Sequence, residues 1–100
     1  MDITTALEGT KATIGLVGKL AVQTSPDLEA TIAALPATTT DFAIDLTDLD
    51  YISSAGLRVL VSTQKLAERR GGTLRILHPI DDVFDVFEMT GLSEIFDIER

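Results

Sequence analysis

The pattern of apolar and polar residues along the chain predicts five short strands. Runs rich in aliphatic and β-branched residues, bounded by glycine, proline or polar residues, are typical of strands. They cover residues 3–9, 12–18, 42–52, 73–77 and 94–100. The first two runs are separated only by Gly9–Lys11, which predicts a tight turn between paired strands. In the third run, Phe42, Ile44 and Leu46 recur at every second position, as expected of a strand with one buried face.

A helical period replaces this alternation in three segments, 24–35, 55–72 and 80–92, and predicts three helices. Each segment has an apolar stripe that should pack on the sheet. The first stripe consists of Leu28, Ile32 and Leu35, and the third of Ile80, Val83, Phe84 and Phe87. In the second helix Leu57, Leu60 and Val61, followed by Gln64 and Ala67, fall on one face.

Residues suited to helix ends support these bounds. Ser25 is expected to cap the first helix, with Pro26 at the first helical position. The pair Gly71–Gly72 should end the second helix, and Gly91 should adopt a left-handed conformation at the end of the third.

The element order β-β-α-β-α-β-α-β predicts an α/β fold. Strands that alternate with helices imply parallel pairing with right-handed crossovers, and the short first turn adds an antiparallel pair. We therefore expect a mixed sheet of four to five strands, covered on one face by three or more helices. The chain of 100 residues is expected to form one domain, residues 1–100, on a single core.

Composition narrows the possible functions. Sixteen acidic residues against eight basic ones give a formal charge of −8, which disfavours binding to nucleic acid and anionic membranes. The charge suits a soluble protein with a basic partner, or it serves solubility alone. No cysteine is present, so disulfides and thiolate chemistry are excluded. No apolar run is long enough to cross a membrane and the N-terminus does not resemble a signal peptide, so we expect a soluble cytoplasmic protein.

Two adjacent serines lie where the third strand gives way to the second helix. Either Ser53 or Ser54 can cap the helix, and this is the simplest interpretation of one hydroxyl. A nucleophilic serine would need His78, the only histidine, as its base, and His78 is expected to be an ordinary strand-end residue instead. The third possibility is that a serine is there to be modified.

Other candidate sites are weaker. Asp45, Asp48 and Asp50 do not match a calcium-binding loop and are expected to be solvated acids or turn formers, so we predict no metal site. Gly56 is unusual in the first turn of a helix. We expect its missing side chain to let a partner approach closely, so that Gly56→Leu should weaken partner binding and leave the fold intact.

Three stretches resemble the STAS domain, the fold shared by anti-sigma factor antagonists and the cytoplasmic tails of sulfate transporters. "IDLTDLDYISSAGLRVLV" resembles the family signature, "VFDVFEMTGLSEIFDI" its closing segment, and "LVGKLAVQTSPDLEATI" its second strand and first helix. The resemblance extends from about Ile3 to Ile98.

The resemblance implies a role for each residue of the serine motif. The antagonists have an aspartate, a phosphorylated serine, a small residue, glycine and leucine, which correspond here to Ser53, Ser54, Ala55, Gly56 and Leu57. Ser54 is thus the implied phosphorylation site, with Ser53 as the alternative. The implied partner surface consists of Ser53, Ser54, Ala55, Gly56, Leu57 and Arg58. The chain departs from the pattern at Ser53 and at Ala21, where the family has acidic residues.

The implied function is that of a binding protein, not an enzyme, with no cofactor of its own. An unphosphorylated antagonist binds an anti-sigma factor, a GHKL-type serine kinase, and so releases a sigma factor. The kinase uses ATP and magnesium to phosphorylate the serine, the complex separates, and a phosphatase restores the serine. No contact with nucleic acid and no membrane insertion are implied.

An alternative from the same resemblance is a STAS accessory subunit that binds the ATPase of a membrane lipid-transport complex. A serine hydrolase that depends on His78 is a third, less favoured possibility.

Overall fold

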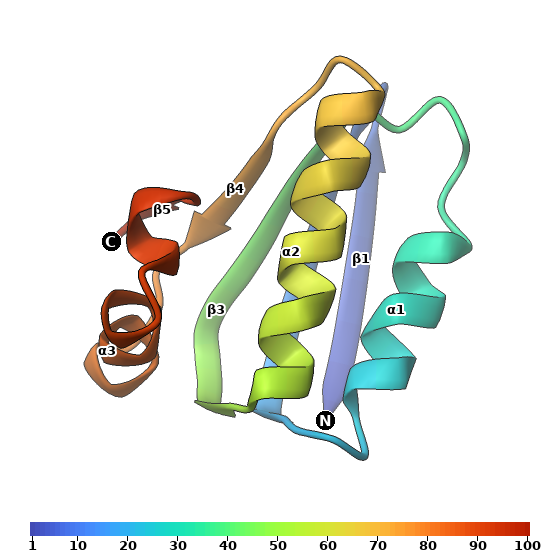
Figure 1. Ribbon diagram of the computed structural model, residues 1–100. Helices are drawn as coiled ribbons and strands as arrows, with labels where there is room; N and C mark the ends of the chain where they lie inside the picture. The colour runs from blue at the N-terminus through green and yellow to red at the C-terminus, as the bar shows by residue number, and fades with distance from the viewer.

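The central feature of the fold is a five-stranded mixed sheet with the strand order β1-β2-β3-β4-β5, as shown by a computed structural model that describes residues 1–100. The strands are β1 (Asp2–Glu8), β2 (Lys11–Leu20), β3 (Asp41–Ile52), β4 (Leu74–Leu77) and β5 (Asp97–Glu99). β1 pairs with β2 in antiparallel orientation, and the other three pairs of neighbours are parallel (Figure 1). The predicted mixed sheet and element order are confirmed.

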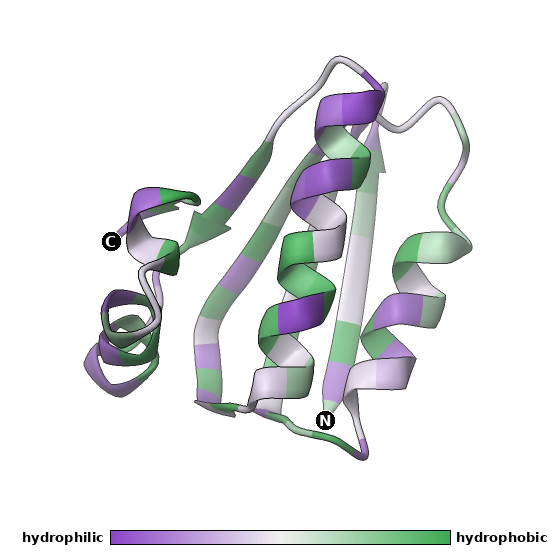
Figure 2. Ribbon diagram, in the orientation of Figure 1, coloured by the Kyte–Doolittle hydropathy of each residue, from purple (hydrophilic) through white to green (hydrophobic).

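Three helices pack against one face of this sheet. They are α1 (Ser25–Ala33), α2 (Ser54–Arg69) and α3 (Asp81–Met89), and a short 3₁₀ turn, η1 (Leu92–Glu94), follows α3. Residues of all three helices share one core with the helix-facing residues of the middle strands, and Figure 2 shows hydrophobic and hydrophilic positions alternating along much of β3 and β4. None of these helices has both the length and the apolar character that a membrane crossing requires.

β3 contains two β-bulges that the sequence pattern did not predict. Gly15 pairs with Asp45 but Val17 pairs with Asp48, and one further residue of β3 is inserted between the pairings of Gly18 and Lys19. Each insertion places two consecutive residues on the exposed side, so that the buried positions after Leu46 follow at intervals of three. The buried residues of β3 on the helix side are Phe42, Ile44, Leu46, Leu49 and Ile52.

The start of α1 differs from the prediction. Ser25 does not cap the helix but is its first residue, and its hydroxyl donates to the carbonyl of Ala21 at 2.6 Å. Thr24 is at the N-cap position without a side-chain bond to the helix; its hydroxyl donates to the carbonyl of Lys19 at 2.7 Å and accepts the N–H of Ala21 at 2.8 Å. Both hydroxyls therefore fix the turn that leads from β2 into α1.

The bounds of α1 and β5 and the buried face of α2 also differ from the prediction. α1 ends at Ala33, so that Leu35 lies beyond it, and β5 is confined to Asp97–Glu99 because the chain first forms η1. Gly91 has the predicted left-handed backbone, with φ of 78°. In α2, Val61 and Gln64 are only partly buried, whereas Val59 and Thr63 are buried although the predicted stripe omitted them.

Asp45 stabilises the first bulge of β3. Its Oδ1 accepts a hydrogen bond from the Thr47 hydroxyl at 2.6 Å and another from the Thr47 N–H at 3.0 Å. The bond from the Thr47 side chain is the main reason that the pKa of Asp45 is lowered; partial burial opposes it, and the Thr47 N–H and nearby His78 add to it.

This lowered pKa predicts how stability depends on pH. The ionised Asp45 stabilises the folded chain above the ordinary aspartate pKa of about 3.9, and the contribution is lost as the pH falls through the lower pKa of the folded state. Asp45→Asn keeps an oxygen acceptor without the charge. It should lower the melting temperature at about pH 7, and its difference from the native chain should shrink towards about pH 3. Thermal melts across this range provide the measurement.

The matched control is Asp50→Asn, at the second bulge, where the exposed carboxylate makes no hydrogen bond within the chain. It should leave the melting temperature close to native. If the melting temperatures of Asp45→Asn and the native chain differed more at acid pH than at neutral pH, the stabilising role of the ionised Asp45 would be contradicted.

Candidate functional site

The serine pair lies at the junction between β3 and α2. β3 ends at Ile52, Ser53 is the single connecting residue, and Ser54 begins the helix. The junction is at the carboxyl end of a parallel strand, the edge at which open α/β sheets place their binding sites. The prediction that Ser54 stands at the start of the second helix is confirmed. We refer to Ser53, Ser54 and Ala55 as the serine site.

Ser53 is the residue that caps α2. It has an extended backbone, and its Oγ accepts a hydrogen bond from the N–H of Gly56 at 3.3 Å. Its own N–H donates to the carbonyl of Leu20 at 2.8 Å, and its carbonyl accepts the N–H of Leu57 at 2.9 Å. The polar groups of Ser53 are thus engaged in holding the helix to the ends of both strands.

Ser54 is exposed, and its hydroxyl makes no hydrogen bond within the chain. The first hydrogen bond inside the helix is the one from Leu57 to Ser53, so the N–H groups of Ser54 and Ala55 have no carbonyl partner within α2. These groups add to the positive end of the helix dipole. The hydroxyl of Ser54 is therefore available to another molecule, in a setting that tolerates negative charge.

The structure corrects the expected role of Gly56. Gly56 is buried, and a Cβ atom placed on it would lie 2.7 Å from Cγ of Leu20 and 3.1 Å from Cγ1 of Ile52. The missing side chain lets α2 approach the sheet, so Gly56 cannot contact a partner directly. Leu57 is only 8% exposed and belongs to the same core. The surface expected of residues 53–58 is thus reduced to the serine site and Arg58.

Arg58 and one residue that the sequence analysis missed extend the serine site. Arg58 is exposed and lines, together with Ala55, a hollow of about 390 Å³ between α1 and α2. Val22, which is 67% exposed, lines the opposite side. An exposed aliphatic residue in the turn between β2 and α1, next to the polar Gln23 and Thr24, was the signal that could have revealed Val22.

His78 lies far from the serine site. Its N–H donates to the carbonyl of Glu99 at 2.6 Å, and Nδ1 lies 3.2 Å from the carbonyl oxygen of Arg100, as expected of a strand-end residue. Asp45 is the residue of β3 that pairs beside Leu77, and seven more residues of β3, 46–52, precede Ser53. At 3.3 Å per residue, this separation is roughly 20 Å. The arrangement does not support a serine–histidine hydrolase.

The acidic residues of β3 do not form a metal site. Asp48 and Asp50 are exposed, while Asp45 binds Thr47, which agrees with the expectation of solvated acids and local turn formers. No group of three or more acidic or histidine side chains is close enough together to hold a metal ion.

Comparison with known proteins identifies the family. The family model described as "Mlab, STAS domain" matches residues 3–98, nearly the whole chain. This chain belongs to the STAS domain family. The resemblance inferred from the serine motif and the closing segment is confirmed.

Several anti-sigma factor antagonists resemble this chain in sequence or in fold. The anti-sigma-B factor antagonist of Bacillus subtilis (strain 168) is 32% identical over 85% of this chain and 78% of its own length. The anti-sigma factor antagonist SpoIIAA, solved in its unphosphorylated form, has a TM-score of 0.82 at 19% identity over 99% of this chain and 89% of its own. SpoIIAA of Bacillus in the phosphorylated form has a TM-score of 0.78 at 18% identity, over 99% of this chain and 92% of its own length.

The relative from Bacillus subtilis and the unphosphorylated SpoIIAA are both antagonists of anti-sigma factors. Anti-sigma factor antagonists are not enzymes, which agrees with the prediction that this chain is not an enzyme. The likeness to SpoIIAA extends to the whole five-stranded sheet and its three helices, and confirms the predicted fold class.

The contacts of Gly56 generate a prediction about stability. Gly56→Ala should lower the melting temperature, because filling a packed core costs about 1–3 kcal/mol, more than the gain of about 1 kcal/mol from the better helix former. Gly56→Leu should lower it further, in contrast to the sequence-based expectation of a native fold. Thermal melts followed by circular dichroism provide the measurement.

Ser54→Ala is the control in the same helical turn, since the exposed Ser54 hydroxyl has no partner in the chain. Its melting temperature should stay close to native. A native-like melting curve for Gly56→Leu would show that α2 is not held against Leu20 and Ile52 as described.

Proposed function

We propose that this STAS protein is an anti-sigma factor antagonist whose binding is switched off by phosphorylation of Ser54. The family match and the curated relatives support the general role. The observation that carries the finer proposal is the difference between the two serines. Ser53 is occupied as the cap of α2, whereas the neighbouring Ser54 is exposed and has a free hydroxyl.

The chemistry requires only that Ser54 reach a bound nucleotide. The Oγ of Ser54 attacks the γ-phosphorus of ATP held with magnesium by the anti-sigma factor kinase. A bond forms between Oγ and phosphorus, the bond from that phosphorus to the β–γ bridging oxygen breaks, ADP leaves, and the serine proton is released. A phosphatase hydrolyses the phosphoserine and restores the hydroxyl. The STAS chain is the substrate in both reactions, and it acts where the sigma factor acts, in the cytoplasm.

The phosphate should alter binding without altering the fold. Phosphoserine carries a charge of about −1.5 to −2 at neutral pH. At the start of α2 the unpaired N–H groups and the positive helix end tolerate this charge. A partner surface that fits the small neutral side chains of Ser54 and Ala55 has no such compensation. Desolvation of the charge in that contact then drives the complex apart.

The serine at position 53, where the family pattern has an aspartate, is compatible with this proposal. Serine and aspartate are both preferred N-cap residues, so Ser53 performs the structural task of the aspartate that the family pattern has here. What the chain lacks at this position is a negative charge beside the phosphorylated residue. The switch therefore operates here with a neutral cap.

The prediction concerns three variants of the serine site. Ser54→Ala should bind the anti-sigma factor and resist release by ATP, and Ser54→Asp should bind at least about tenfold more weakly, since it places a charge in the contact. Ser53→Ala should lose about 1 kcal/mol of stability with its cap, yet remain a substrate at Ser54. The probes are the purified anti-sigma factor kinases encoded in the same genome as this chain.

Calorimetric titration with and without ATP, followed by mass spectrometry of the modified chain, distinguishes the outcomes. Phosphate found on Ser53 alone would assign the switch to the cap residue. Equal affinities for the native chain and for both Ser54 variants, with no phosphate transferred, would overturn the proposal.

A second candidate function is supported by the description of the matching family model, which names Mlab. In that case the chain would be an accessory subunit that binds the ATPase of a membrane lipid-transport complex. Co-purification with such an ATPase from the same genome, unaffected by Ser54→Asp, would favour this function over the phosphorylation switch.

A further inference from the structure

A continuous groove runs between α1 and α2, starting beside the serine site. Its first part is the hollow of about 390 Å³ that Ala55 and Arg58 line, and a second hollow of about 200 Å³ continues it towards Arg69. The two parts share Glu29, Val59 and Ser62 as lining residues. We refer to this feature as the α1–α2 groove.

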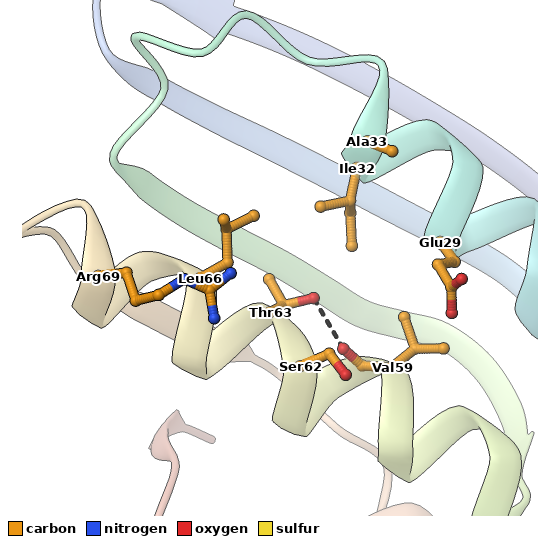
Figure 3. Close-up of a pocket in the computed structure, with 8 residues that line it drawn as sticks. All are labelled: Glu29, Ile32, Ala33, Val59, Ser62, Thr63, Leu66 and Arg69. Atoms are coloured by element: carbon orange, nitrogen blue, oxygen red, sulfur yellow. Dashed lines mark hydrogen bonds between the residues drawn. The ribbon is translucent and has the colours of Figure 1, made fainter.

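The floor of the α1–α2 groove is apolar. In its second part Ile32 from α1 and Val59 and Leu66 from α2 line the groove, and Figure 3 shows these side chains between the two helices. Ile32 and Val59 are almost fully buried, so they bring the helices together and leave only a shallow apolar surface to a ligand. A flat partner surface would not fill this groove, whereas a narrow apolar segment would.

The rim of the groove formed by α2 is basic. Arg58 and Arg69 line the groove, and the exposed Lys65 lies between them on the same side of the helix, at spacings of seven and four residues. We refer to these three residues as the basic stripe. The three ion pairs of the chain involve only Arg75 and Arg100 as cations, so no residue of the basic stripe is paired.

The basic stripe is exceptional in a chain with a net charge of −8. The opposite wall, α1, contributes one acidic side chain to the groove, Glu29, which forms no ion pair with either arginine. Elsewhere the acids dominate: α3 has the four exposed acids Asp81, Asp82, Asp85 and Glu88 and no base. An acidic partner would be repelled by most of this surface and attracted along α2.

We infer that the α1–α2 groove binds an acidic, amphipathic segment of the anti-sigma factor, with apolar side chains on Val59 and Leu66 and carboxylates on the basic stripe. This inference rests on the proposed function and extends its contact beyond the serine site. From Ser54 to Arg69 the helix rises by about 22 Å, at 1.5 Å per residue. A segment of that length binds along the groove while the serine site contacts the nucleotide-binding part of the same partner.

Arg58 connects the groove to the phosphorylation switch. It lies four residues after Ser54, one helical turn away on the same side of α2, and lines the first part of the groove. A phosphate on Ser54 is within reach of the Arg58 guanidinium, which binds phosphate and carboxylate groups alike. Phosphorylation therefore both adds a charge at the serine site and withdraws Arg58 from the acidic segment.

Arg69 provides the sharpest test, because it lies at the far end of the groove from Ser54. The experiment measures the affinity of the unphosphorylated chain for the anti-sigma factor kinases encoded in the same genome, by calorimetry at low and at physiological salt. Arg69→Glu should weaken binding about fivefold or more, with the larger effect at low salt. Lys11→Glu changes the net charge by the same amount at an exposed residue of β2 that does not line the groove, and it should leave the affinity unchanged.

A second variant tests the apolar floor. Ser62 is exposed and lines both parts of the groove, so Ser62→Tyr should block the groove, weaken binding at least tenfold, and leave the melting temperature close to native. Native affinity for both Arg69→Glu and Ser62→Tyr, while Ser54→Asp still weakens binding, would overturn the groove inference alone. If none of the kinases binds the native chain, the proposed function fails, and the inference that rests on it fails as well.

Discussion

The parallel pairing of β2 with β3 is the constraint on which the rest of this molecule depends. It is the longest parallel pairing in the sheet, and it runs from Lys11 beside Asp41 to Leu20 beside Ile52. The bond from the Ser53 N–H to the Leu20 carbonyl extends it by one more residue. Because Ser53 is held in an extended conformation by this bond, its side chain can turn back and cap α2. The orientation of the helix, and with it the serine site, is thus a consequence of strand pairing.

The two bulges in β3 allow this pairing to reach the end of both strands. β2 has 10 residues and β3 has 12, and each bulge accommodates one of the two extra residues. The first bulge shifts the buried side from even-numbered residues to the odd-numbered Leu49, and the second bulge returns it to the even-numbered Ile52. Ile52 therefore points into the core together with Leu20, and these two side chains form the surface on which Gly56 rests. Asp48, Asp50 and Tyr51 point outwards as a result.

The sequence was sufficient to predict the elements whose apolar pattern is regular. Strict alternation in the first half of β3 and helical spacing in α3 placed these elements correctly, and the serines were correctly placed at the start of α2 because strand and helix patterns meet there. The bulges were not predictable from single residues, since "TDLDY" fits several registers equally well. The sheet pairing that selects one register involves residues about 30 positions apart.

The interpretation of Gly56 failed for a related reason. A glycine in the first turn of a helix indicates a close approach, but the sequence does not say whether the approaching group is a partner or the protein's own core. The structure places Leu20 and Ile52 there, from two different strands. Similarly, Val59 and Thr63 lie outside the predicted stripe of α2 because they face α1 and not the sheet. The spacing of apolar residues within one helix does not show that a second helix packs against its side. Interactions between distant segments account for each of these differences.

The separation of cap and switch explains how one hydroxyl can control binding without disturbing the fold. If a single serine both capped α2 and accepted the phosphate, the added charge and bulk would act directly on the hydrogen bond to the Gly56 N–H and perturb the helix start. Here Ser53 provides the acceptor and Ser54 remains exposed. Phosphorylation then mainly weakens the partner contact, where the partner offers no group to compensate the added charge, and it changes the stability of the folded chain little. Arg58, one turn further along α2, is the nearest cation on that side of the helix. Because Arg58 lines the part of the α1–α2 groove beside the serine site, a phosphate on Ser54 acts on the groove through this residue.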